Sequence, residues 1–397
     1  MKRAQSLIVL CALAPFSDSP AAEPRIPPGV VRQVEQSEAL PPLCPRPSGA
    51  AVAASEVLRL IESGEDVDLS GRVIEGSLEW PRPGAADSEA AGGARRMTGA
   101  LQLDAAQIGG NLALRGVVVA GNLSLHCTEV RGGLDLGATD VRGKLDASRM
   151  IVVGPARLEN VTTTQELTFG MARFEGGLDL SGARIGGAVR APSLQVAADL
   201  TLRGGSNGGL FFSRAHIGGA TILQDLLVAG GLSGGQAEFM KGLTMSSVRF
   251  RERIDLADGA IGAALTIRDL ESRGPILISP ESCDALEMTG VRAEGGLSLW
   301  DGRFKRAKLE DVIVKGDATL DDAHFLGPVE FRRSTLGERF SADETEFRDR
   351  CLFASTRIPG DDPLSAAHFR VPPTIVDAEI RPPARENPGE DEDESDD

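Results

Sequence analysis

Apolar residues recur along most of the chain with a period of eleven residues. Residues 106–116 read AQIGGNLALRG and residues 117–127 read VVVAGNLSLHC, and the pattern returns at residues 128–138, 172–182 and 312–322. Position three of the unit is Val, Ile or Phe, position five is usually Gly, and positions seven and nine are mostly Leu. About 23 such units fit between residues 106 and 355, and three are one residue short, near Gly205, Glu281 and Gly302.

The eleven-residue period has two structural interpretations, because eleven residues also make about three turns of a helix. A glycine at position five would cost a helix about 1 kcal/mol in nearly every unit. The Leu-x-Leu pairs instead follow the alternation of a strand, which places both leucines on one face. The pattern therefore predicts an all-β parallel solenoid, built of short strands separated by corners that contain glycine.

Two units are expected to form one coil, since a single unit is too short to close around a filled core. Residues at the same position of successive coils then stack in columns. The two inward columns are Leu112, Leu134, Ala156, Leu178 and Leu200, and Leu114, Leu136, Leu158, Leu180 and Leu202. Each buried Leu contributes roughly 1.5 to 3 kcal/mol, so these columns hold the array together. With about 4.8 Å per coil, about 12 coils predict a rod roughly 55 to 60 Å long.

A short amphipathic helix is expected just before the repeats, over residues 53–64. Ser55 can cap its first turn and Gly64 can end it. Its apolar face is formed by Val57, Leu58 and Ile61. Such a helix covers the first coil, whose core and strand edges would otherwise face solvent.

The repeats and their flanking segments divide the chain into six expected parts. They are a signal peptide (1–22), a proline-rich irregular leader (23–52), the cap helix (53–64), the solenoid (65–358, with an inserted loop at 83–94), an irregular C-terminal segment (359–386) and an acidic disordered tail (387–397).

The first residues have the features of a secretory signal peptide. Lys2 and Arg3 precede an apolar run over residues 7–14, and Ala21 and Ala22 offer a cleavage site. The run is shorter than the about 20 residues that a membrane-spanning helix needs. We therefore expect an exported protein, periplasmic or extracellular, without a transmembrane helix in its mature chain.

Four cysteines follow the expected cleavage site. They are Cys44, Cys127, Cys283 and Cys351. Export permits disulfides, but the spacings are long and the chain has no CxxC motif, so neither a zinc site nor a redox motif is indicated. We expect isolated packed or surface thiols, and we expect Cys44 and Cys351 to lie near opposite ends of the array.

The formal net charge of −16 is unevenly distributed. Seven of the last eight residues are Asp or Glu, and the rest of the chain keeps a moderate excess of negative charge. This balance disfavours binding to the phosphates of nucleic acids. The composition of 47 Gly, 14 Phe, 2 Trp and 0 Tyr suits a narrow interior of small aliphatic side chains.

The repeats resemble the pentapeptide-repeat proteins and their longer-unit relatives, in which a small residue and a Leu or Phe two positions apart point inward. The segments ARF at residues 172–174, LDL at 178–180 and ARI at 183–185 carry this pairing. The resemblance covers about three quarters of the chain, and it implies a right-handed, four-sided β-helix with a scaffold or interaction role. The chain departs from the strict family pattern because its inward centres alternate in steps of six and five residues.

No motif in the sequence predicts a catalytic, cofactor-binding or metal-binding residue. Residues 231–235, GLSGG, match the GxSxG pattern of hydrolases, but they fall at positions six to ten of an ordinary repeat and not on a strand-to-helix turn. The histidines have neither metal-ligand spacing nor an obvious acid or serine partner. They are His126, His216, His324 and His368.

Alternating charges are expected along one outward column. Position eight of successive coils is Asp135, Arg157 and Asp179, which predicts a ladder of exposed ion pairs worth about 0 to 1 kcal/mol each. A carboxylate pair for glycoside cleavage would need neighbouring acids without the intervening arginine.

The sequence thus predicts a non-catalytic exported scaffold that binds a protein or a cell-envelope component, with no cofactor. The identity of that partner and the oligomeric state stay open. Two alternatives also stay open. A carbohydrate-active β-helix would show clustered outward acids in a groove, and an acidic DNA mimic that binds a topoisomerase would have to be cytoplasmic.

Overall fold

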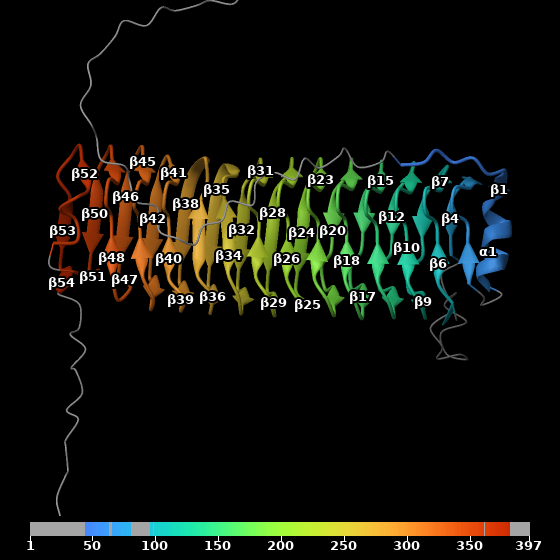
Figure 1. The fold of residues 1–397 in the computed structure, drawn as a ribbon, viewed down its shortest axis with the longest axis horizontal. Coiled ribbons are helices and arrows are strands. Elements are labelled where there is room, and N and C mark those ends of the chain that lie inside the picture. The colour runs from blue at the N-terminus through green and yellow to red at the C-terminus, as the bar shows by residue number, and fades with distance from the viewer. Residues whose placement is uncertain (1–43, 63–65, 81–95, 98, 361, 382–397) are drawn as a thin grey trace, which may run out of the picture. The chain divides into compact units, whose positions relative to one another are not determined.

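The computed structural model describes residues 44–62, 66–80, 96–97, 99–360 and 362–381. These residues form a parallel β-solenoid of about 14 turns, with one short helix, α1 (Ala54–Glu62), at its N-terminal end (Figure 1). The predicted fold class is confirmed. The expected signal peptide, the inserted loop at 83–94 and the acidic tail lie outside the described residues.

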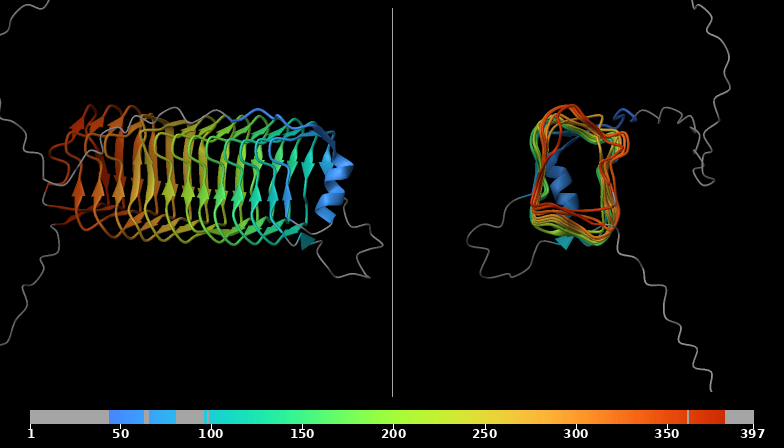
Figure 2. Two further views of the ribbon diagram at one scale, coloured as in Figure 1. Left: turned by 45° about the vertical axis from the view of Figure 1, so that its right-hand side comes forward. Right: turned by 90° about the vertical axis from the view of Figure 1, so that its left-hand side faces the viewer.

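Each turn carries four short strands, one on each side of a four-sided coil. The view along the axis shows this outline, with α1 lying across the end (Figure 2). Strands of successive turns pair in parallel, so that Leu134 lies beside Ala156 of the next turn. The described strands form three sheets, of 27, 13 and 14 strands, and the largest covers two adjacent sides.

We number the four sides as faces 1 to 4 in chain order, and faces 1 and 2 share the largest sheet. Face 1 holds β1 (Ala51–Ala53), β3 (Val73–Glu75), β7 (Gln107–Ile108), β11 (Glu129–Val130), β15 (Ile151–Val152), β19 (Arg173–Phe174), β23 (Gln195–Val196), β27 (His216–Ile217), β31 (Glu238–Phe239), β41 (Arg303–Phe304), β45 (His324–Phe325), β49 (Glu346–Phe347) and β52 (His368–Phe369). Face 2 holds β4 (Leu78–Glu79), β8 (Leu112–Ala113), β12 (Leu134–Asp135), β16 (Ala156–Arg157), β20 (Leu178–Asp179), β24 (Leu200–Arg203), β28 (Thr221–Gln224), β32 (Leu243–Ser246), β42 (Ala307–Glu310), β46 (Val329–Arg332), β50 (Cys351–Ala354) and β53 (Thr374–Val376). Two longer strands, β35 (Ala260–Arg268) and β38 (Ser282–Thr289), continue across both faces.

Faces 3 and 4 each have a sheet of their own. Face 3 holds β5 (Arg96–Met97), β9 (Val118–Val119), β13 (Asp140–Val141), β17 (Thr162–Thr163), β21 (Arg184–Ile185), β25 (Ser206–Asn207), β29 (Leu227–Val228), β33 (Arg249–Phe250), β36 (Glu271–Ser272), β39 (Arg292–Ala293), β43 (Ile313–Val314), β47 (Thr335–Leu336), β51 (Arg357–Pro359) and β54 (Glu379–Arg381). Face 4 holds β2 (Val67–Asp68), β6 (Leu101–Gln102), β10 (Leu123–Ser124), β14 (Leu145–Asp146), β18 (Leu167–Thr168), β22 (Val189–Arg190), β26 (Leu210–Phe211), β30 (Leu232–Ser233), β34 (Ile254–Ala257), β37 (Ile276–Ser279), β40 (Leu297–Ser298), β44 (Ala318–Thr319) and β48 (Phe340–Ser341).

The core includes the predicted columns, together with the inward residues of the other faces. The residues of the first column pair in register along face 2, and all residues of both columns are buried. The three predicted short units also appear, because the sequence separation is one residue shorter than usual where Val189 pairs with Leu210, Ala264 with Ala285, and Arg303 with His324. A missing residue is therefore absorbed at a corner, and the columns stay aligned.

Half of the corners turn on a residue in the left-handed conformation, and most of these residues are not glycine. Between faces 2 and 3, Ala138 has φ 54° and Asn160 has φ 59°. A left-handed conformation is strained for residues other than glycine. Hydrogen bonds to the next turn offset this strain: the amide of Ala138 donates to the carbonyl of Glu159, and the amide of Asn160 donates to the carbonyl of Ser181, each at 2.7 Å. The predicted glycines at position five lie in the other corners, as at Gly132 and Gly176.

The position-five glycines serve close packing between turns. Gly176 lies in the other kind of corner, where the backbone of one turn rests on the next. A Cβ there would come within 2.7 Å of the carbonyl oxygen of Gly154 in the preceding turn. Glycine is required at this position because the neighbouring turn leaves no room for a side chain.

The solenoid extends beyond the predicted end at residue 358. β52, β53 and β54 pair with β49, β50 and β51, so residues 368–381 form a further turn. Phe369 joins a stack with Phe347, Phe325 and Phe304, at centroid spacings of 4.7 to 5.4 Å. The expectation of an irregular segment over 359–386 was wrong for these residues, because proline and polar residues in this stretch mask the eleven-residue pattern.

The N-terminal cap differs in detail from the prediction. Val57 and Ile61 are buried as expected, but α1 begins at Ala54, directly after β1, so Ser55 lies within the helix and does not cap it. The end expected at Gly64 lies outside the described residues. β1 pairs with β3, which shows that the last residues of the expected leader belong to the sheet.

A disulfide joins the leader to the solenoid. Cys44 is bonded to Cys127, 83 residues away, at the corner between faces 4 and 1. The amides of Ser48 and Gly49 donate to the carbonyl of Gly71, which lies in the same corner two turns nearer the cap. Residues 44–49 therefore run along this corner toward β1. The expectation of isolated thiols was wrong for this pair, because the spacing in sequence does not reveal that the leader folds back.

Candidate functional site

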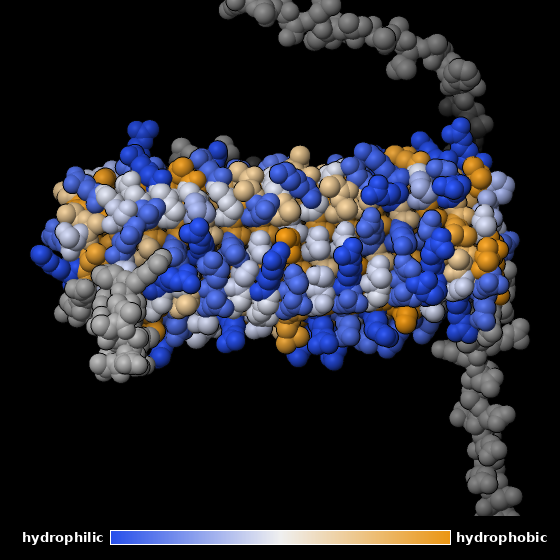
Figure 3. All heavy atoms as spheres, turned by 180° about the vertical axis from the view of Figure 1, so that it is seen from behind, coloured by the Kyte–Doolittle hydropathy of each residue, from blue (hydrophilic) through white to orange (hydrophobic). Residues whose placement is uncertain are grey.

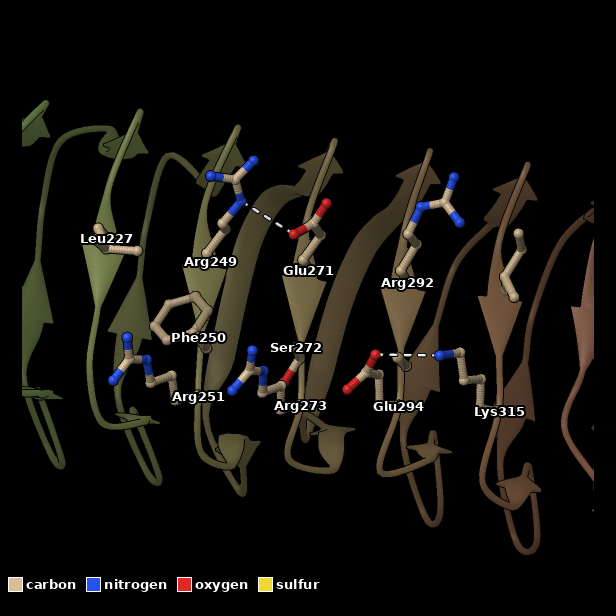
Figure 4. A pocket seen from close by; sticks show the side chains of 12 residues that line it. Leu227, Arg249, Phe250, Arg251, Glu271, Ser272, Arg273, Arg292, Glu294 and Lys315 are labelled. Carbon is tan, nitrogen blue, oxygen red and sulfur yellow. Dashed lines mark hydrogen bonds and ion pairs between the residues drawn. The ribbon is translucent and has the colours of Figure 1, made fainter.

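A shallow groove of about 500 Å³ runs along face 3, across β29, β33, β36, β39 and β43 (Figure 4). Its sides are two rows of outward side chains, which flank the inward residue of each strand. Row one is Leu227, Arg249, Glu271, Arg292 and Ile313, and row two is Arg251, Arg273, Glu294 and Lys315. The rows are roughly 6.6 Å apart, and the groove is roughly 19 Å long from the spacing of strands. We call this feature the basic groove.

The floor of the basic groove is the strand backbone between the two rows, because the side chains there point into the core. Ser272 and Ala293 occupy the inward column between the two rows, and both are buried. The hydroxyl of Ser272 donates to the carbonyl of Gly274 at 2.8 Å, so it does not project into the groove. The long side chains of the two rows therefore stand above a low floor.

Two of the five cations of the groove are neutralised within it. Nε of Arg249 lies 3.0 Å from a carboxylate oxygen of Glu271, and Nζ of Lys315 lies 3.2 Å from one of Glu294. No described residue forms an ion pair or a side-chain hydrogen bond with the remaining three, Arg251, Arg273 and Arg292 (Figure 4). The groove thus presents three unpaired guanidinium groups on a chain whose net charge is −16.

The positive charge is greatest along row two. Row one borders an adjoining hollow at the corner between faces 2 and 3, and Asp225 and Asp269 line that hollow. These carboxylates reduce the attraction of row one for anions. Row two offers Arg251 and Arg273 on successive turns, about 4.8 Å apart. A guanidinium group presents a planar fork of donors that matches a carboxylate.

Exposed apolar side chains mark the two ends of row one. Leu227 is 49% exposed and Ile313 is 36% exposed. The long side of the rod seen in Figure 3 is covered mainly by hydrophilic residues, with hydrophobic ones in narrow bands. The basic groove therefore combines guanidinium groups with apolar contact area, a composition suited to an extended acidic chain that carries some apolar groups.

No protein-family model, no curated protein and no solved structure matches the chain. The structure itself shows the parallel solenoid with a spacing of about 22 residues.

The structure gives two of the histidines acid partners that the sequence pattern did not reveal. Nδ1 of His216 lies 2.7 Å from a carboxylate oxygen of Glu238, and Nδ1 of His324 lies 3.3 Å from one of Glu346. Each partner occupies the equivalent position in the next turn. These pairs belong to the same kind of surface ladder as Arg249 with Glu271. Among the described residues no group of three or more His, Cys, Asp or Glu could hold a metal ion.

The GxSxG segment has the structure of an ordinary repeat. Ser233 lies in β30 on face 4, and its hydroxyl is 3.0 Å from that of Ser213 in the preceding turn. The prediction that the segment follows the repeat and makes no strand-to-helix turn is confirmed.

The predicted charge ladder has the expected register but different pairs. Asp135, Arg157 and Asp179 lie side by side in successive turns. Within the described part of the chain, however, Asp135 pairs with Arg115 at 3.3 Å and Arg157 pairs with neither acid. Asp135 also accepts the amide of Gly137, two residues on, at 2.9 Å, which turns its carboxylate toward the corner. The expected ladder through Arg157 was therefore wrong.

The other two cysteines of the solenoid are buried thiols, as expected. Cys283 and Cys351 are free. Burial raises the pKa of the Cys283 thiol to about 11, and it raises the pKa of the Cys351 thiol as well. A thiol is nucleophilic as its thiolate, so neither residue is suited to catalysis.

The sequence contains a signal for the basic groove that the search for motifs missed. Positions two and four of alternate units face outward on face 3, and in four successive coils they read RFR, ESR, RAE and IVK. Aligning these positions coil by coil places five cations in two adjacent columns. No single unit shows this signal, because the cations come together only when the outward positions of successive coils are compared.

Proposed function

We propose that this protein is a non-catalytic, exported repeat scaffold that binds an acidic partner protein along the basic groove. The observation that carries the proposal is the set of three guanidinium groups, Arg251, Arg273 and Arg292, for which the described residues provide no anion. Unpaired arginines grouped on successive turns are a source of affinity for carboxylates. The rigid spacing of the turns favours a partner segment that is extended along the rod.

Export is supported by the disulfide between Cys44 and Cys127. Disulfides of this structural kind persist in oxidising compartments and are rare in the cytosol. The apolar run at residues 7–14 and the small residues at 20–22 point the same way. Both observations disfavour the cytoplasmic DNA mimic. No helix of the described residues is long and apolar enough to cross a membrane.

A scaffold role is favoured over glycoside cleavage by the charges in the groove. Its two carboxylates, Glu271 and Glu294, are each paired with a cation. A glycosidase would instead use a pair of acids facing the sugar. We further propose that the chain is a variant of the pentapeptide-repeat proteins with an eleven-residue unit, which the four-sided coil and the buried Leu pairs support.

Binding can be tested with a fluorescein-labelled peptide of eight glutamates, titrated against the full-length protein and followed by anisotropy. The variant with Arg251, Arg273 and Arg292 changed to Gln should bind roughly tenfold or more weakly at low salt, because each exposed pair is worth about 0.2 to 1 kcal/mol. The control changes three arginines outside the groove to Gln. They are Arg157, Arg184 and Arg203, all exposed.

The control separates local binding from the effect of total charge, since both triple variants lose three positive charges. An equal loss of affinity in both variants, or no binding of the peptide to any form, would contradict the proposed groove. Export is tested separately. The full-length protein is expressed in a bacterial host, the cells are fractionated, and the mature N-terminus is determined by mass spectrometry. A chain in the cytoplasm that retains Met1 would contradict export.

A further inference from the structure

The chain leaves the described solenoid on the same face as the basic groove. β54 is the last strand of face 3, and its residue Arg381 pairs with Pro359. By the register of face 3, this column continues through Gly337 to Lys315, Glu294, Arg273 and Arg251. The residues that follow Arg381 therefore start in line with row two.

The following segment is long enough to reach the whole of row two. Lys315 is three turns from Arg381, roughly 14 Å, and Arg251 is six turns away, roughly 29 Å. The nine residues from Arg381 to Glu390 span up to about 30 Å when extended. Residues 390–397 can therefore lie over any part of row two.

The charge of this segment complements row two. Residues 390–397 read EDEDESDD, with seven carboxylates. Row two has three cations, and its one acid, Glu294, is already paired with Lys315. The column positions between Lys315 and Arg381 are Gly337 and Pro359, which carry no charge. The acids Asp225 and Asp269 lie on the far side of row one. An acidic segment is thus drawn to row two and away from the corner between faces 2 and 3.

We infer that residues 390–397 bind row two of the basic groove of the same chain and compete there with the partner. The inference rests on the proposed function, and it names a regulator of that site. Because the segment is tethered about nine residues away, its effective concentration at the groove is of millimolar order. An external partner therefore has to displace it. Exposed ion pairs are individually weak and are screened by salt, so the docked state weakens as ionic strength rises.

Zero-length carbodiimide crosslinking of the full-length protein tests the docked state, because it joins lysines to carboxylates that touch them. Lys315 is the lysine of the groove. Lys305 is a matched control, because its side chain is equally exposed at 68% and is likewise paired with a carboxylate, that of Asp284. It belongs to the same turn but lies at the opposite corner, between faces 1 and 2.

The expected result is a set of crosslinked peptides that join Lys315 to residues 390–397 at about 20 mM salt and disappear at about 1 M. The variant with Arg251 and Arg273 changed to Gln should lose them. Crosslinks from the segment to Lys305 as frequent as those to Lys315 would overturn the inference. The experiment is repeated with a mixture of unlabelled and ¹⁵N-labelled protein. Crosslinks that join a labelled peptide to an unlabelled one would show that the segment binds a second copy of the protein, and they would overturn binding within one chain.

Competition is tested with a variant in which the seven carboxylates of residues 390–397 are changed to their amides. It should bind the labelled glutamate peptide roughly three- to tenfold more tightly than the unmodified protein. If crosslinking to Lys315 fails and the peptide still binds in the groove, the inference falls and the proposed function stands. If the amide variant does not bind the peptide at all, the proposed function falls. If the crosslink forms and affinity does not change, competition is overturned.

Discussion

The ring of Phe369 stacks on the ring of Phe347, with centroids 4.7 Å apart and planes inclined by 4°. Phe369 lies in the last described turn and Phe347 in the turn before it. Two backbone hydrogen bonds also join these turns. The amide of His368 donates to the carbonyl of Thr345 at 2.8 Å, and the amide of Arg370 donates to the carbonyl of Phe347 at 2.9 Å. An aromatic contact thus anchors the turn at the end of the solenoid.

Phe369→Ala should loosen this last turn without unfolding the rest. Offset aromatic pairs contribute about 0.5 to 1.5 kcal/mol beyond their burial, and only neighbouring turns share contacts in a solenoid. Hydrogen exchange should quicken for the amides of residues 368–381 and stay unchanged before residue 340. Val371→Ala, an exposed apolar residue of the same segment, serves as the control. Equal effects of the two variants would refute the anchoring role.

Leu178→Asp should disrupt the solenoid. Leu178 is 1% exposed and lies between Ala156 and Leu200 in its column. The change removes a buried apolar side chain and places a carboxylate in the core, at a cost of at least about 4 kcal/mol. Circular dichroism during thermal unfolding measures it. Ser233→Ala, in β30, should leave the melting curve unchanged. A Leu178→Asp protein as stable as the parent would show that the column assignment is wrong.

Gly176→Ala should destabilise the coil, whereas Gly170→Ala should not. A Cβ on Gly176 meets backbone atoms of the preceding turn at 2.7 Å, and a Cβ on Gly170 meets nothing closer than 3.6 Å. We expect a loss of about 1 to 3 kcal/mol for the first change, from overpacking. The second should be neutral or slightly stabilising, since Ala restricts the unfolded chain. Denaturant unfolding compares them. A reversed order would contradict the packing role of position five.

Arg333→Gln should raise the pKa of Glu310. Hydrogen bonds and charge from Lys308 and then from Arg333 hold this pKa at about 2, below its ordinary value of 4.5. Because the folded pKa is depressed, the resulting stabilisation is present above about pH 4.5 and is lost as the pH falls toward 2. In the variant, Lys308 still lowers the pKa, so the shift is partial. An NMR titration of the carboxyl carbon measures it, and Arg350→Gln should leave the pKa unchanged.

Thiol counting tests the disulfide and the processing of the chain together. Burial keeps Cys283 and Cys351 unreactive in the native protein, and the pKa of Cys283 is raised to about 11. Ellman's reagent should therefore not react with these two thiols before denaturation. After denaturation without reductant, it should find two thiols if Cys11 has been removed with a signal peptide, and three if Cys11 remains. Additional thiols in the exported, denatured protein would mean that Cys44 and Cys127 are not bonded.

The solenoid could be predicted because its periodicity is local and strict. The two-unit period determines which side chains stack, so the columns through Leu178 and the short units near Gly205, Glu281 and Gly302 follow from the sequence. The corner conformation could not be predicted in this way. Residues such as Ala138 adopt a left-handed φ because the ladder on either side requires it, and their own identity does not indicate it.

The long-range contacts of irregular segments could not be predicted from the sequence either. The bond between Cys44 and Cys127 depends on the path of residues 44–49 along a corner, and no repeat describes that path. The basic groove was predictable in principle, because its rows follow the same register as the core. It was missed because outward columns tolerate many residue types, so that Arg251 and Arg273 are noticed only when the columns are aligned.

The disulfide also decides how the solenoid would respond to mechanical force. A pull on the chain ahead of Cys44 is transmitted through the bond to Cys127, in the corner just before β11. The segment between the two cysteines contains α1 and the first turns, and it forms a closed covalent ring that bears none of the tension. Under oxidising conditions the turn that contains Cys127 would yield first. After reduction, the same pull would peel β1 and the cap helix from the end of the rod.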